Sequence, residues 1–179
     1  MSVMEIVTYP NEVLTNPAVP VDEVDSKIAR LMDAMAETMY ASQGVGLAAP
    51  QVGVGRRVLT MDIGDGDSGG HGLVHLANPV LKEGTGELIW EEGCLSFPGL
   101  TVQVKRHESV VVVGLDREGK ERTLEASGLA AVCLQHEIDH LDGIVFVDRL
   151  RGLKKRFALR EYNRLIREAR ATGTALPLS

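Results

Sequence analysis

The sequence has little cysteine and no long apolar run. Its 179 residues include only Cys94 and Cys133, which are expected to be reduced thiols rather than a disulfide framework. No apolar run approaches the roughly 20 residues that cross a bilayer. Residues 1–10 also lack the basic start and apolar stretch of a secretory signal. These absences argue against a secreted protein and against a membrane partner, and they predict a cytoplasmic protein.

Internal repeats and low-complexity tracts are also missing. Hydrophobic residues make up 44% of the chain and charged residues 25%, which is typical of a globular protein and not of a disordered one. A chain of this length buries a full core without disulfide support. We therefore predict a single domain over residues 1–179.

The charge is small in total but unevenly distributed. The net charge is −6, yet residues 149–170 hold nine basic and two acidic side chains, so that this segment carries +7 and the remainder −13. The total argues against a DNA-binding protein. The basic segment, in contrast, is suited to contact phosphates.

Helical periodicity occurs in three places. Apolar residues from Ile28 to Met39 predict a helix that ends near Ser42, with Asp22 or Asp25 as its cap, and its methionines are expected in the core. A second helix is predicted over residues 129–141, with Ser127 as a possible cap and Gly143 as its stop. The third is the basic C-terminal helix within residues 150–171, whose periodic pattern begins at residue 153.

Between the first and second helices the sequence favours strands. A loop containing Gly44, Gly46 and Pro50 comes first, and the Gly/Asp/Ser-rich residues 64–72 predict a surface loop. The predicted strands, of which the sixth pairs with the fifth in a hairpin, are residues 57–63, 73–77, 87–91, 100–104, 109–115, 121–126 and 144–147. The class is therefore α+β, with antiparallel strands around the second helix and helices toward both ends.

The strongest chemical motif is His-Glu-x-x-His at residues 136–140. Histidines four residues apart lie on one helix face, so that His136 and His140 can converge on one cation. Glu137 can then reach the open side of the metal and transfer protons. Two surface histidines beside a carboxylate are the alternative, but the apolar helix around them argues for the metal site.

A catalytic metal of this kind usually has a third protein ligand and one open position. His140 is the last histidine, so the third ligand is not a downstream histidine. Glu161 and Glu168 are possible, but both belong to the charged tail. Cys94 is the better candidate, because a thiolate and two imidazoles leave room for water. Cys133 is expected to pack in the core or to line a pocket.

Residues Gly44–Gln51 form a glycine-containing segment, GVGLAAPQ. It lacks the Lys-Ser/Thr of a phosphate loop, which disfavours nucleotide binding. Either it is a turn between helix and strand, or it is a wall that lets a ligand approach the backbone, with Gln51 as a donor.

Taken together, three motifs resemble the peptide deformylases of the bacterial type. They are GVGLAAPQ at 44–51, EGCLS at 92–96 and QHEIDHLDG at 135–143, and residues 6–10 and 115–119 are also similar to the family. The resemblance implies a metal-dependent hydrolase that removes the N-formyl group from the formyl-methionine of nascent polypeptides and releases formate.

The resemblance also assigns residues. It implies one divalent metal per chain, with Fe²⁺ as the native ion and Zn²⁺, Ni²⁺ or Co²⁺ as possible occupants. Cys94, His136 and His140 would hold the metal, Glu137 would transfer the proton, and Gln51 and the Leu95 N–H would stabilise the oxyanion. The residues expected to bind substrate are Val45, Gly46, Leu47, Val132 and Cys133.

Two further expectations accompany the resemblance. Arg106 and Asp139 could pair in support of the metal site, or each could be a surface charge. The basic helix within residues 150–171 resembles that of bacterial deformylases that dock near the ribosomal exit tunnel, where its charge would suit rRNA phosphates. A solvated helix packed on the domain is the alternative.

Two other functions remain open. A zinc endopeptidase would use Glu161 as the third ligand and leave Cys94 idle. A non-catalytic, metal-stabilised ribosome-binding module would need neither Glu137 nor Gln51, so the presence of both argues against it.

Overall fold

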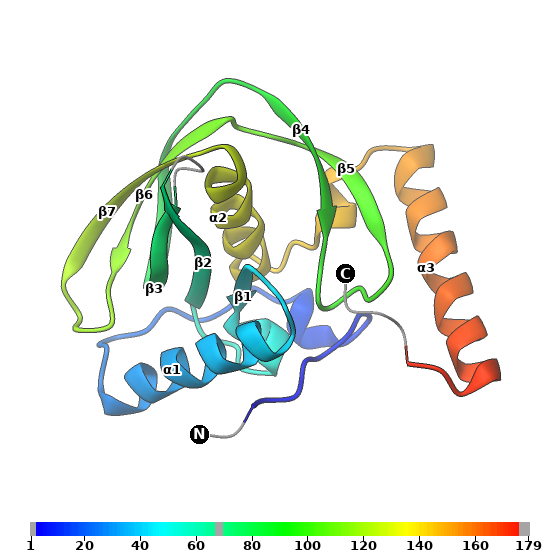
Figure 1. Cartoon of the computed structure of the whole chain (residues 1–179), viewed down its shortest axis with the longest axis horizontal. Coiled ribbons are helices and arrows are strands. Elements are labelled where there is room, and N and C mark those ends of the chain that lie inside the picture. Colours follow the sequence, from blue (N-terminus) through cyan, green and yellow to red (C-terminus); the bar gives the residue numbers. More distant parts are fainter. Residues whose placement is uncertain (1–2, 67–69, 176–179) are drawn as a thin grey trace.

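The computed structural model describes residues 3–66 and 70–175, and its architecture is α+β (Figure 1). Three α-helices are present: α1 (Ser26–Ala41), α2 (Gly128–Leu141) and α3 (Leu153–Thr172). Short 3-10 turns occupy η1 (Glu12–Leu14), η2 (Ala49–Val52) and η3 (Phe146–Arg149). No helix of the described residues is both long and apolar enough to span a membrane.

The strands form two antiparallel sheets beside α2. The first has five strands in the order β1-β2-β3-β6-β7, and the second is the hairpin β4-β5. Their bounds are β1 (Gly46–Ala48), β2 (Val58–Gly66), β3 (Gly70–Thr85), β4 (Leu88–Gly93), β5 (Thr101–Arg106), β6 (Ser109–Leu115) and β7 (Glu121–Ser127). Figure 1 shows α2 at the centre, with the five-stranded sheet on one side and the hairpin on the other.

Helix α2 is buried on every side. All residues from Ala130 to Leu141 are buried. The polar and charged ones among them are Gln135, His136, Glu137, Asp139 and His140. Gly143 ends it at a φ of +72°, where a Cβ would lie 2.8 Å from the backbone of Asn16. Ser127 occupies the predicted N-cap position, although its side chain makes no capping hydrogen bond.

Of the two predicted N-cap residues of α1, the structure has Asp25 at that position and not Asp22. Its carboxylate accepts hydrogen bonds from the N–H groups of Lys27 and Ile28, which satisfies two donors that the first turn leaves unpaired. The expected methionine packing is confirmed. Met32, Met35 and Met39 are fully buried in a core shared with Leu47, Val58 and Leu95.

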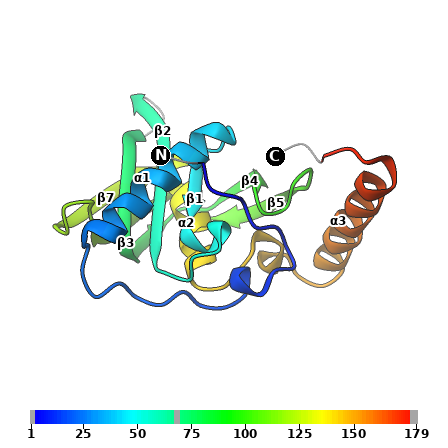
Figure 2. The same cartoon turned by 90° about the horizontal axis from the view of Figure 1, so that it is seen from below.

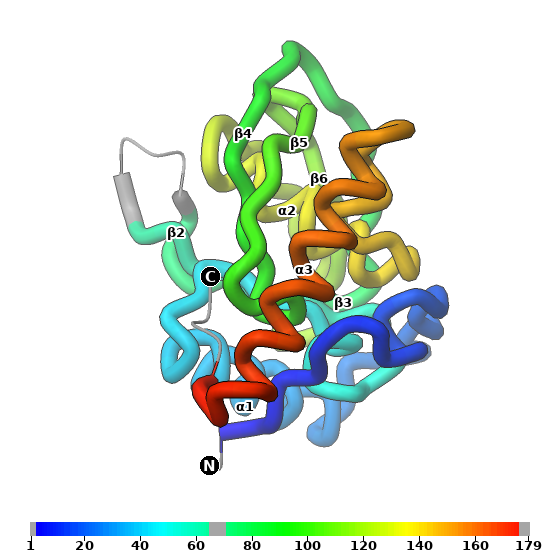
Figure 3. The backbone as a smooth tube through the Cα atoms, turned by 90° about the vertical axis from the view of Figure 1, so that its right-hand side faces the viewer, coloured from blue at the N-terminus to red at the C-terminus, as the bar shows by residue number. Residues whose placement is uncertain are grey.

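Helix α3 lies at the edge of the molecule, on the side of β4 and β5 (Figure 2). Figure 3, which faces this side, shows α3 along the outer surface. Of its residues only Ala158 and Tyr162 are buried. Tyr162 belongs to an aromatic cluster with Tyr9, Phe97 and Phe146. The ring centroids of Phe97 and Tyr162 are 4.8 Å apart.

Three expectations about secondary structure are wrong. The predicted loop over residues 64–72 is mostly strand, because β2 continues to Gly66 and β3 begins at Gly70; residues 67–69 lie outside the described part. The predicted loop with Gly44, Gly46 and Pro50 contains β1 and η2. The predicted strand at 144–147 overlaps the turn η3, since Phe146 is buried against the aromatic cluster instead of pairing with a strand.

Candidate metal centre and catalytic pocket

Three buried side chains from two distant parts of the chain converge. His136 and His140 lie one turn apart on α2, and Cys94 follows the end of β4. Their possible ligand atoms all lie within 4.8 Å of one another, and Cys94 Sγ is 3.3 Å from His140 Nε2. The structure thus brings together the three residues that the sequence proposed as ligands.

These residues fit a divalent metal. A thiolate with two imidazoles is a donor set that iron and zinc both accept. His136 uses Nδ1 to contact Glu92 at 2.8 Å, which leaves Nε2 for the convergence point. Across the described residues, Glu161 and Glu168 do not join this group, because both pair with Arg164 on α3. The ligand set of the endopeptidase alternative is therefore wrong.

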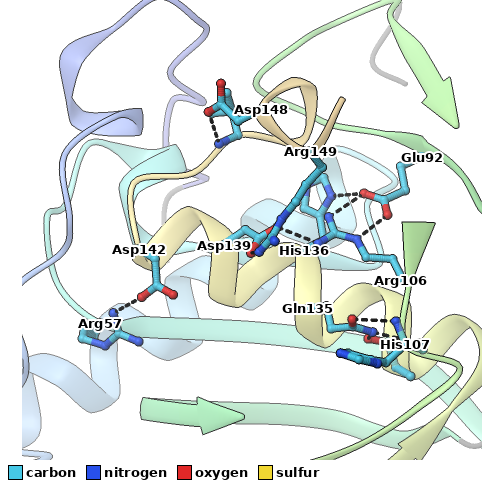
Figure 4. A network of polar contacts seen from close by, with 12 residues as sticks. Arg57, Glu92, Arg106, His107, Gln135, His136, Asp139, Asp142, Asp148 and Arg149 are labelled. Carbon is cyan, nitrogen blue, oxygen red and sulfur yellow. Dashed lines mark hydrogen bonds and ion pairs between the residues drawn. The ribbon is translucent and has the colours of Figure 1, made fainter. Parts of the chain in front are cut away.

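Behind His136 lies a charge network of Glu92, Arg106, Asp139 and Arg149 (Figure 4). Arg106 donates Nε to Glu92 Oε1 at 2.7 Å and Nη2 to Glu92 Oε2 at 3.0 Å. Its Nη1 donates to Asp139 Oδ2 at 2.6 Å, so the structure contains the Arg106–Asp139 pair. Arg149 donates to both oxygens of Asp139.

This network controls the ionisation of Glu92. Burial acts to raise the pKa of Glu92, but hydrogen bonds from Arg106 and His136 outweigh it and lower that pKa to about 2. Glu92 therefore stays a carboxylate that can orient the ring of His136. Sequence reasoning assigned no role to Glu92 or Arg149. Side chains alternate along a strand, so Trp90 and Glu92 of β4 are on the same face as Cys94, which follows the strand. This spacing from the predicted ligand could have indicated a role for Glu92.

Glu137 has a different environment on the pocket side of α2. Burial raises its pKa to about 7, and its Oε2 atom is buried with no hydrogen-bond partner among the described residues. Gly46 of β1 lies against it, where a Cβ would be 2.6 Å from both Glu137 Oε1 and Cys133 Sγ. Gly46 is thus needed for β1 to approach α2, a reason different from the expected access of substrate.

Gln51 and Leu95 border the same site. The Gln51 side chain is buried, and its Oε1 accepts the Ala48 N–H at 2.8 Å. This contact turns its Nε2 toward Cys94 Sγ, 3.6 Å away. Leu95 directly follows Cys94 and lines the same cavity.

A cavity of about 260 Å³ opens at these residues. It contains Val45, Gly46, Val132 and Cys133, as expected, whereas Leu47 does not line it and is instead fully buried against α1. The expectation that Leu47 lines the substrate pocket is therefore not met by this cavity. Because side chains alternate along β1, Gly46 faces α2 and Leu47 faces α1. Other lining residues that sequence reasoning missed are Gln43, Trp90, Glu91 and Leu129. Leu129 could have been found from its helical spacing to Val132 and Cys133.

A buried cysteine and two buried histidines that can hold a metal, next to a cavity that contains a carboxyl group of raised pKa, are the arrangement of a metallohydrolase. A sequence model of the family "Polypeptide deformylase" matches residues 3–156. The chain belongs to the peptide deformylase family, whose members are metal-dependent enzymes that remove N-formyl groups from nascent peptides.

Individual relatives agree with this assignment. A peptide deformylase of Thermodesulfovibrio yellowstonii is 48% identical over 155 residues, which cover 87% of this chain and 93% of the relative. A crystal structure of the Ehrlichia chaffeensis peptide deformylase superposes with a TM-score of 0.86 at 39% identity, covering 93% of this chain and 98% of that one. The same enzyme in complex with actinonin gives 0.85 at 40% identity, covering 92% and 98%.

Proposed function

We propose that this chain removes the formyl group from the N-terminal formyl-methionine of nascent polypeptides in the cytoplasm, as a single catalytic domain over residues 1–179. The observation that carries the proposal is the convergence of Cys94, His136 and His140, next to a cavity that Cys94, His136 and Glu137 line. Water and the formamide are consumed, and formate and a free amine are produced.

Cys94, His136 and His140 would hold one divalent metal. We infer Fe²⁺ as the native ion from the resemblance to the family. Zn²⁺, Ni²⁺ or Co²⁺ are alternatives, because thiolate and imidazole donors accept all four ions. When bound, such an ion supplies Lewis acidity that lowers the pKa of water and polarises a carbonyl group.

Glu137 transfers the proton in this mechanism. Its carboxylate accepts a proton from the attacking water and delivers it to the leaving amine, so that the C–N bond breaks without forming an unprotonated amide anion. A pKa of about 7 suits both steps. Oε2 of Glu137 is the atom assigned to this role, since it has no competing partner in the described part of the chain.

Gln51 and Leu95 stabilise the negative oxygen that develops on the formyl carbon. Gln51 donates through Nε2, and its contact with the Ala48 N–H holds the side chain in that orientation before substrate binds. The backbone N–H of Leu95 is the second donor. Such preorganised donors stabilise the transition state more than the ground state.

The apolar part of the cavity receives the methionine side chain. Val45, Val132 and Cys133 line it, together with Trp90 and Leu129. Burial raises the pKa of the Cys133 thiol, which keeps it protonated and compatible with an apolar side chain.

We also infer contact with ribosomal RNA through α3. Its exposed surface carries the basic residues, and Arg156, Arg160 and Arg167 line one groove beside the exposed Phe157. Changing the three arginines to glutamine should reduce co-sedimentation with ribosomes at low salt and flatten its salt dependence. Equal binding by both proteins would reject this role for α3.

The main test is formate release from a short formyl-methionyl peptide by the metal-loaded protein. Glu137→Gln should lower kcat by about 10²- to 10⁴-fold while the metal content is unchanged. Glu161→Gln removes an exposed glutamate of α3 and serves as the matched control, with parent activity expected. Cys94→Ala should lose the metal. No release by a metal-loaded parent protein would reject the proposed function.

A further inference from the structure

The charge network extends beyond the metal centre to a residue outside the catalytic pocket. From His136 it runs through Glu92, Arg106 and Asp139 to Arg149 (Figure 4). Arg149 belongs to η3, which follows α2 and precedes α3. It does not line the catalytic cavity, but lines a separate cleft behind α2 with Arg106 and Asp139.

Charge balance within the network depends on Arg149. Glu92 and Asp139 are two buried carboxylates, and Arg106 is the one fully buried guanidinium between them, with 3% of its side chain exposed. Arg149 contributes the second positive charge from the surface, with 45% of its side chain exposed. A buried carboxylate without a compensating charge is strongly unfavourable.

The hydrogen bonds show how the two arginines divide the carboxylates. Arg106 contacts Glu92 through two parallel N–H groups but reaches Asp139 through Nη1 alone. Arg149 contacts both oxygens of Asp139, Oδ1 through Nη2 and, through Nε, the Oδ2 that Arg106 also contacts. Because Arg149 satisfies Asp139, Arg106 is left in the bidentate geometry with Glu92.

We propose that Arg149 is a positioning residue for the metal centre, which acts through Asp139 and Arg106 to hold Glu92 against the ring of His136. The proposal rests on the proposed function only in that His136 is taken as a metal ligand. Without Arg149, Asp139 draws Arg106 away from Glu92, and Glu92 then holds the imidazole less well. The expected result is weaker metal binding, without loss of any ligand.

The test measures Co²⁺ binding to the metal-free full-length protein by competition with a chelator, together with the visible absorption of the bound ion. Arg149→Met should raise the Kd for Co²⁺ about tenfold, the lower end of the effect of residues that support metal ligands. Its cobalt absorption bands should shift, because the orientation of an imidazole ligand changes. Arg149→Lys keeps the charge that compensates Asp139 but loses the fork geometry, and it should recover only part of the affinity.

Arg57→Met is the matched control. Arg57 pairs with Asp142 at the end of α2, with Nη1 2.6 Å from Oδ1 (Figure 4). It also donates a hydrogen bond to the carbonyl oxygen of Leu141. The substitution removes the same charge next to the same helix but leaves the charge network intact. We expect the Co²⁺ affinity and spectrum of the parent.

A second background tests the route. In Asp139→Asn, the carboxylate that Arg149 compensates is absent, so adding Arg149→Met should change the Kd for Co²⁺ by less than about twofold, since coupled residues are non-additive. A full tenfold effect in this background would overturn the proposal. Unchanged affinity and spectrum in Arg149→Met, with only lower thermal stability, would overturn it as well.

Failure of this proposal can be separated from failure of the proposed function. Co²⁺ binding requires no formylated substrate. A parent protein that binds Co²⁺ with the expected dependence on Arg149, yet releases no formate, would contradict the function alone. Normal formate release with Co²⁺ affinity independent of Arg149 would contradict the positioning role alone.

Discussion

Two ion pairs of the same residue types, one between β4 and β5 behind α2 and one on α3, have opposite surroundings. The ion pair behind α2, between Glu92 and Arg106, leaves 3% of each side chain exposed. The pair on α3, between Glu161 and Arg164, leaves 46% and 49% exposed. In the first case removing one partner strands a buried charge, whereas in the second water replaces the partner.

The pKa of a glutamate on α2 and that of a glutamate on α3 are also shifted in opposite directions. Burial raises the pKa of Glu137 on α2 to about 7. The hydrogen bond from Arg164 lowers the pKa of Glu161 on α3. The comparison shows that surroundings, and not residue type, separate a glutamate that can exchange protons near neutral pH from one that remains ionised.

The largest effect on stability is expected at the buried pair. Arg106→Met leaves Glu92 and Asp139 without their shared partner and should cost about 3–5 kcal/mol of unfolding free energy. Urea unfolding of the metal-free parent and variant measures this difference. A loss below about 1 kcal/mol would mean that the buried pair behaves like a surface pair.

An intermediate effect is expected where α3 is anchored. Tyr162 is 1% exposed, and its ring packs at an angle of 49° to that of Phe97 in the aromatic cluster, so Tyr162→Ala should cost about 3 kcal/mol of unfolding free energy. Amide hydrogen exchange should accelerate in α3 more than in α2, while formate release stays near that of the parent. Equal acceleration of hydrogen exchange in both helices would show that they open as one cooperative unit. It would contradict the difference in local stability between α2 and α3.

The smallest effect is expected on the exposed face of α3. Arg164→Gln breaks contacts with Glu161 and Glu168, yet the unfolding free energy should barely change, because exposed pairs are screened and entropically costly. The difference should shrink further as salt is added. A cost comparable to that of Arg106→Met, measured by the same urea titration, would refute the distinction.

Sequence reasoning succeeded where the signal was local. The spacing of His136 and His140 places both on one helix face, and the hairpin of β6 and β7 follows from strands flanking a short turn. It failed where distant segments compete for the same residues. Phe146 was expected in a strand, but the aromatic cluster buries it in η3. Leu47 was expected in the substrate pocket, but it packs against α1.

The sequence by itself determined the motifs, the family and the α+β class, because helix periodicity and motif spacing depend on neighbouring residues. Only the tertiary structure decided that Sγ of Cys94 lies 3.3 Å from Nε2 of His140, although the two residues are 46 positions apart in the chain. It alone also decided that Arg149 completes the charge network through Asp139. Such contacts depend on burial and on how helices and sheets pack, which no local pattern of residues encodes.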